Sequence, residues 1–112
     1  MGNAEAGAFY SKVAGVTYGL RQTALLRLKR YNLDSIAVNL VRENNPEDGN
    51  AVAVLVTVAG RRPFKVGYLP RSIAATWSYL VAAGRVEARL ERVTGGNGKA
   101  LGAVIRLVLA AA

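Results

Sequence analysis

The segment 50–59 constrains the fold more than any other part of the chain. It is almost continuously apolar, rich in β-branched valine, and free of charged side chains. β-branched residues favour strands, and a strand without a polar side is typical of one that is covered on both faces. The segment is also shorter than the roughly 18 apolar residues that a membrane-spanning helix needs. We therefore expect a central, doubly covered strand in a soluble domain.

Other segments have the alternating or β-branched pattern that predicts strands. Turn-forming Asn, Pro, Asp and Gly residues separate them, above all in segment 43–50. A glycine-rich stretch at 95–98 indicates a hairpin between the last two strands. The expected strands besides 50–59 are 9–18, 36–41, 64–69, 85–93 and 101–109.

Two segments have helical spacing of apolar residues. Segment 21–32 predicts a short amphipathic helix with a basic outer face, formed by Arg21, Arg27, Lys29 and Arg30. A second helix is expected to begin after Pro70 and to end near Gly84. The order β-α-β-β-β-α-β-β predicts an α+β domain: a small curled sheet or barrel of about six strands with a helix at each end.

The chain of 112 residues is the size of one domain with one core. We expect this domain to span 9–109, with a flexible N-terminal segment 1–8 and a short tail 110–112. The expected core residues lie on the apolar side of their segments, and they are Val13, Val38, Val54, Val66, Trp77 and Leu90.

The amino-acid composition limits the kinds of catalytic and metal site that the chain can form. The chain has no His and no Cys, which excludes the usual zinc sites, Cys nucleophiles and Ser-His-Asp triads. We expect no enzyme activity and no cofactor. A net charge of +8 gives a positive field that attracts polyanions such as nucleic acids. The N-terminus lacks the pattern of a secretory signal, so we expect a cytoplasmic protein that does not bind membranes.

Two motifs carry a more specific signal. The first is RENNPEDGNAVAV, residues 42–54, and the second is VGYLPRSIA, residues 66–74. Together they resemble the HIRAN domain family, and the similarity extends over about 9–109. The resemblance implies an OB-like or SH3-like barrel of the kind that occurs fused to DNA-remodelling helicases and nucleases, and also alone in bacterial and phage proteins; this chain resembles a stand-alone member. It also implies binding of single-stranded DNA, because a member in a helicase-like transcription factor captures free 3′ ends in DNA repair or replication.

The resemblance implies roles for two residues. Tyr18 matches the aromatic residue that stacks on the last base, and Asp48 matches the acceptor of the terminal hydroxyl. Arg71 follows Pro70 at the start of the second expected helix, where its charge and the free N–H groups of the helix can face a phosphate. Thr17 and Glu47 depart from the family pattern of Arg and an aromatic residue, so a base held between two rings is not expected. The full set of candidate nucleic-acid contacts is Tyr18, Arg21, Arg27, Arg30, Asn45, Asp48, Tyr68 and Arg71.

Other interpretations of these residues stay open. Asn45 and Asp48 are suited to satisfying backbone N–H groups in a turn, and Tyr18 is suited to capping the barrel. The same barrel could instead bind a peptide or an acidic protein partner. A metal-dependent nuclease would need the acidic residues Asp34, Glu43, Glu47 and Asp48. Salt dependence of DNA binding, binding of an acidic peptide, and Mg²⁺-stimulated cleavage distinguish the three functions.

Overall fold

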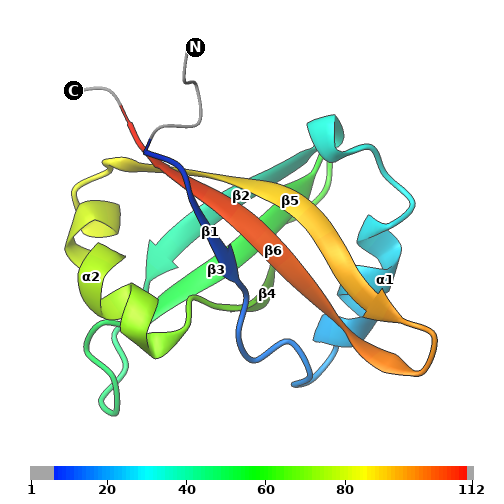
Figure 1. The fold of residues 1–112 in the computed structure, drawn as a ribbon, viewed down its shortest axis with the longest axis horizontal. Coiled ribbons are helices and arrows are strands. Elements are labelled where there is room, and N and C mark those ends of the chain that lie inside the picture. Colours follow the sequence, from blue (N-terminus) through cyan, green and yellow to red (C-terminus); the bar gives the residue numbers. More distant parts are fainter. Residues whose placement is uncertain (1–6, 111–112) are drawn as a thin grey trace.

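A computed structural model describes residues 7–110 and confirms the predicted α+β architecture (Figure 1). The order of elements matches the sequence prediction, with one added 3₁₀ turn, η1. The elements are β1 (Phe9–Lys12), α1 (Arg21–Leu28), η1 (Leu33–Ser35), β2 (Ile36–Arg42), β3 (Val52–Val58), β4 (Phe64–Tyr68), α2 (Arg71–Ala82), β5 (Val86–Gly96) and β6 (Lys99–Leu109).

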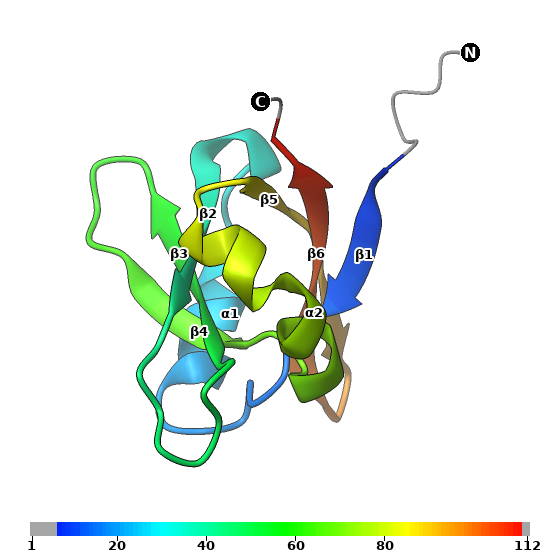
Figure 2. The ribbon, with the colours of Figure 1, turned by 90° about the vertical axis from the view of Figure 1, so that its left-hand side faces the viewer.

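The strands form one antiparallel sheet in the order β1-β6-β5-β2-β3-β4. The sheet bends sharply in its middle, because β2 and β5 share only the pair Val38–Ala88. It therefore curls into a half-barrel, with β1 and β6 facing β2, β3 and β4 (Figure 2). The helices α1 and α2 lie at opposite ends of this half-barrel (Figure 1).

The two edges of the curled sheet meet at one point. Just beyond β1, the Ala14 N–H donates to the Tyr68 carbonyl oxygen at 2.7 Å, and the Tyr68 N–H donates back to Ala14 at 2.9 Å. Gly67 is required here, since a Cβ at this position would collide with the Ala14 carbonyl oxygen and the Val13 side chain. This contact fixes the loop after β1 against the end of β4.

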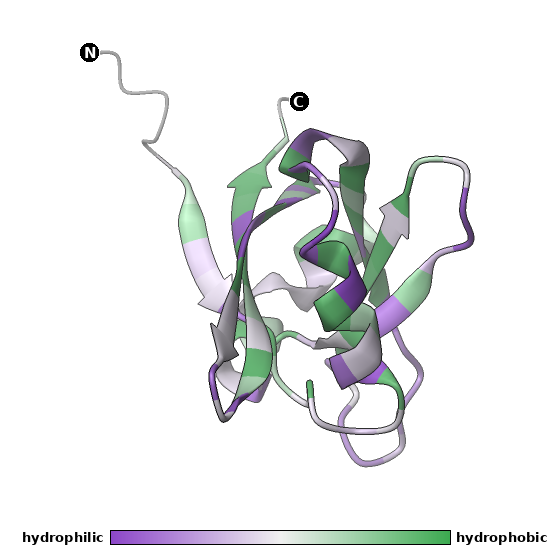
Figure 3. Ribbon diagram, turned by 90° about the vertical axis from the view of Figure 1, so that its right-hand side faces the viewer, coloured by the Kyte–Doolittle hydropathy of each residue, from purple (hydrophilic) through white to green (hydrophobic). Residues whose placement is uncertain are grey.

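The core fills the space between the sheet and α1. Leu25 and Leu28 of α1 are fully buried, and β3 is buried along nearly its whole length, as expected for segment 50–59. Hydrophobic residues dominate β6, whereas the loop between β3 and β4 is hydrophilic (Figure 3). Of the six predicted core residues, Val13, Val38, Val54, Val66 and Leu90 are buried. Trp77 is half-buried, packs against the core, and has its ring 5.9 Å from that of Phe9.

Several boundaries differ from the prediction. The strand expected at 50–59 is shorter, and β5 and β6 extend into the hairpin expected at 95–98, so that β5 ends at Gly96 and β6 begins at Lys99. The first strand ends at Lys12 and not at residue 18, because the chain turns at Gly15 and Gly19, whose φ angles are 71° and 56°. The first helix ends at Leu28, so Lys29 and Arg30 lie in the turn that follows.

The predicted flexible segment and tail fall mostly on 1–6 and 111–112, outside the described residues. The Ala110 N–H donates to the Arg85 carbonyl oxygen at 2.7 Å. Within residues 7–110, neither helix has the length and apolar character needed to cross a membrane.

Candidate nucleic-acid interface

Four predicted contact residues line one shallow pocket of about 370 Å³. Asn45 and Asp48 come from the turn between β2 and β3, Tyr68 ends β4, and Arg71 begins α2. The closure between Ala14 and Tyr68 brings the loop after β1 to the same rim. We call this the turn pocket.

Some polar side chains of the turn between β2 and β3 form hydrogen bonds to the backbone of the same turn. The Asn45 Oδ1 accepts from the Glu47 N–H at 2.9 Å, and the Asp48 Oδ1 accepts from the Asn50 N–H at 3.0 Å. These bonds support the structural interpretation of Asn45 and of one Asp48 oxygen. The other oxygen, Oδ2, lies 3.5 Å from the Arg71 Nε.

Arg71 does not point freely into solvent. Its Nη2 donates to the Glu47 carbonyl oxygen at 2.8 Å, so the guanidinium lies against the turn and beside Asp48. Its side chain is nevertheless 76% exposed. Exposed ion pairs contribute only about 0 to 1 kcal/mol, and this one leaves Arg71 available to an incoming phosphate.

Next to the turn pocket, Arg21 lies between two tyrosine rings. Its Cζ is 5.8 Å from the Tyr18 ring centroid and 5.5 Å from that of Tyr68, within the range of cation–π attraction. The Arg21 Nη1 also donates to the Gly15 carbonyl oxygen at 2.7 Å. Tyr18 stays 70% exposed as a residue, so this arrangement presents an open aromatic side chain.

Sequence reasoning missed the polar network on the other side of Tyr68. The Tyr68 hydroxyl donates to Glu43 at 2.6 Å and accepts from the Lys65 Nζ at 2.8 Å, and Lys65 also pairs with Glu43. Hydrogen bonds from Lys65 and Tyr68 hold the pKa of Glu43 below its ordinary value, and the bond to Glu43 raises the pKa of Lys65. The network fixes the Tyr68 ring at the rim.

A register shift explains why this network forms. The pairing of β4 with β3 shifts by one residue between Val54 and Leu55, which leaves Val66 as the extra residue of a β-bulge. In a regular strand, Lys65 and Tyr68 would point to opposite faces, because they are three positions apart. Here the Lys65 Nζ lies 4.8 Å from the Tyr68 ring centroid. The only available signal in the sequence was Gly67, which can mark a bulge.

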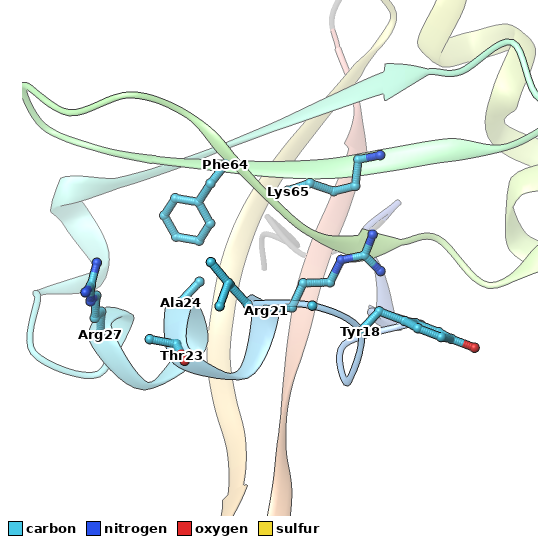
Figure 4. A pocket seen from close by; sticks show the side chains of 9 residues that line it. Tyr18, Arg21, Thr23, Ala24, Arg27, Phe64 and Lys65 are labelled. Carbon is cyan, nitrogen blue, oxygen red and sulfur yellow. The ribbon is translucent and has the colours of Figure 1, made fainter.

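The remaining two candidates are separate from the turn pocket. Arg27 lines a second pocket of about 820 Å³ between α1 and β4, together with Tyr18 and Arg21 (Figure 4). We call this the helix pocket. Arg30 lies in the turn after α1 and lines neither pocket.

The acidic residues that the structure describes do not gather into a metal site. Within residues 7–110, no three His, Cys, Asp or Glu side chains are placed to hold a metal ion together. Glu43 is instead engaged with Lys65 and Tyr68. The groups that the site presents are tyrosine rings, arginine side chains and one carboxylate oxygen of Asp48.

Comparisons with known proteins identify the family and support the fold. The family model of the HIRAN domain matches residues 6–110. The crystal structure of the HIRAN domain of human HLTF has a TM-score of 0.57 and 23% sequence identity, covering 92% of this chain and 74% of that chain. A comparison with curated protein sequences finds no match. Since the family model spans nearly its whole length, the chain belongs to the HIRAN domain family.

Proposed function

We propose that this domain binds single-stranded DNA, with its 3′ end in the turn pocket, and that it catalyses no reaction. The HIRAN family is known for DNA binding, so membership supports a nucleic-acid-binding module. The observation that carries the finer proposal is the exposed Tyr18 ring and its neighbour Arg21, directly beside a pocket that holds both a carboxylate and an arginine.

In this proposal, Tyr18 stacks on the terminal base. Stacking of a base on an aromatic side chain contributes about 1 to 3 kcal/mol and does not depend on the base, because every base has a flat π face. Arg21 stabilises the position of the ring and adds a positive charge for the backbone phosphates. The domain therefore binds single strands of any sequence.

Asp48 supplies the preference for an end. A carboxylate repels a phosphate but accepts a hydrogen bond from a hydroxyl, and a terminal 3′-hydroxyl is present only at the end of a strand. The Asp48 Oδ2 faces Arg71 and not the backbone of the turn, so it is the oxygen that can accept this bond. Arg71 then holds the phosphate that precedes the terminal sugar.

Such a module would deliver DNA ends to a separate helicase or nuclease during repair or replication. The net charge of +8 favours rapid, salt-dependent encounter with DNA. A fluorescence anisotropy titration with 5′-labelled oligonucleotides tests the proposal. We expect affinity to fall steeply with salt and to be higher for a 3′-hydroxyl than for a 3′-phosphate. Salt-independent binding, or tighter binding of an acidic peptide, would contradict it.

A further inference from the structure

We propose that the helix pocket is the site of the second nucleotide, the one that precedes the terminal nucleotide in the turn pocket. This inference rests on the proposed function and extends it from one nucleotide to two. It assigns a role to Leu20 and Phe64, which are not among the predicted nucleic-acid contacts.

The shape and lining of the helix pocket suit a base and its sugar. Its volume of about 820 Å³ falls within the range of small-molecule sites, which is about 300 to 1,000 Å³. Among the residues that line it are Tyr18, Leu20, Arg21, Ala24, Arg27 and Phe64. The Phe64 ring points from β4 toward α1 (Figure 4). Leu20 is 82% exposed, which leaves an apolar surface open at the entrance.

Charge is distributed around this apolar surface in a pattern that matches a nucleotide. Arg21, Ala24 and Arg27 of α1 all line the pocket, and the six-residue spacing separates the two arginines by about 9 Å along the helix axis. Arg27 stands at one end of the pocket and Arg21 nearer the other (Figure 4). No acidic side chain lines the pocket. An apolar body flanked by negative groups is therefore the complementary ligand.

The two pockets are connected through Arg21. Its guanidinium lies near the Tyr18 ring, which lines the helix pocket, and near the Tyr68 ring, which lines the turn pocket. A strand whose last base stacks on Tyr18 would thus pass its preceding phosphate between Arg71, which lines the turn pocket, and Arg21, which lines the helix pocket. This continuity favours a second nucleotide over an acidic peptide, because a peptide bound in the helix pocket has no terminal hydroxyl and phosphate for the turn pocket to bind.

The test compares oligonucleotides that lack a single base. A 5′-labelled single strand with a 3′-hydroxyl is prepared intact, with an abasic second position from the 3′ end, and with an abasic fifth position. We expect the abasic second position to weaken binding about fivefold or more, from the known value of a stacked base. The abasic fifth position should leave the affinity unchanged.

Variants then locate the effect in the helix pocket. Leu20→Ser removes apolar surface at an exposed position, and Leu26→Ser is the matched control, since Leu26 is 55% exposed on α1 and does not line the pocket. In Leu20→Ser, we expect the intact strand and the strand with the abasic second position to bind with nearly equal affinity. In Leu26→Ser, the strand with the abasic second position should still bind about fivefold more weakly than the intact strand. Circular dichroism verifies that both variants fold.

The outcomes separate this inference from the function on which it rests. If the domain binds intact single strands and tolerates the abasic second position, the helix pocket is not a nucleotide site, although the proposed function stands. The inference is also wrong if the penalty is equal in the wild type and Leu20→Ser. If no single strand binds but an acidic peptide with a Leu or Phe residue does, both proposals fail.

Discussion

Replacing Gly67 with alanine should open the barrel where its two edges meet. The added Cβ would collide with the Ala14 carbonyl oxygen and the Val13 side chain, and the backbone cannot relax without separating Ala14 from Tyr68. Two backbone hydrogen bonds, of 2.7 and 2.9 Å, are then lost. At about 0.5 to 1.5 kcal/mol net for each bond, the free energy of unfolding falls by about 1 to 3 kcal/mol.

Urea unfolding followed by Trp77 fluorescence measures this loss, and a thermal scan should show a melting temperature lower by roughly 5 to 15 °C. Gly49→Ala is the matched control. Gly49 has no heavy atom within 4 Å of an added Cβ, and its φ is not positive, so this variant should be as stable as the wild type or slightly more stable. Equal stability of Gly67→Ala and Gly49→Ala would refute the closure argument.

Three further predictions follow from side-chain contacts. Gln22→Ala should lower the free energy of unfolding by about 2 to 3 kcal/mol in urea titrations, because the amide makes three hydrogen bonds that join α1 to the backbone of Val16 and Leu101. The wild type should lose stability relative to Glu43→Gln in acid unfolding curves below pH 4.5. Because the pKa of Glu43 is lowered in the folded state, the ionised carboxylate stabilises the fold at any pH above 4.5, the ordinary pKa of a glutamate. This stabilisation is lost as the pH falls through the folded-state pKa. Replacing Arg27 and Arg30 together should weaken binding of all single strands about equally, and lower the salt slope by about 0.7 for each lost phosphate contact. An unchanged slope in titrations at several salt concentrations would contradict that.

Local patterns predicted most of the fold. The apolar, β-branched segment 50–59 became β3, and the cluster of Asn, Pro, Asp and Gly residues became the turn before it. The first strand was predicted too long, because apolar residues continue through Val16 while Gly15 and Gly19 turn the chain. Periodicity records which residues are apolar, whereas the end of a strand depends on the partner that it pairs with.

The site was predicted less completely. The family motifs pointed to Asp48, Tyr68 and Arg71, which the structure places around one pocket. They could not show that Arg71 lies against the turn, since that contact joins residues far apart in the chain. They also gave no sign of Lys65 beside Tyr68, because a bulge in β4 creates this contact by breaking the alternation on which sequence reasoning relies.

Backbone amide NMR with a short single-stranded oligonucleotide tests the central claim most directly, because it reports where on the domain DNA binds. We expect the largest chemical-shift changes at the amides around the two pockets, which are those of Gly15, Tyr18, Arg21, Asp48 and Tyr68. The amides of α2 beyond its first turn and of the outer face of β5 should not move. Shifts confined to α2 and β5, with none near Tyr18 and Asp48, would contradict the account.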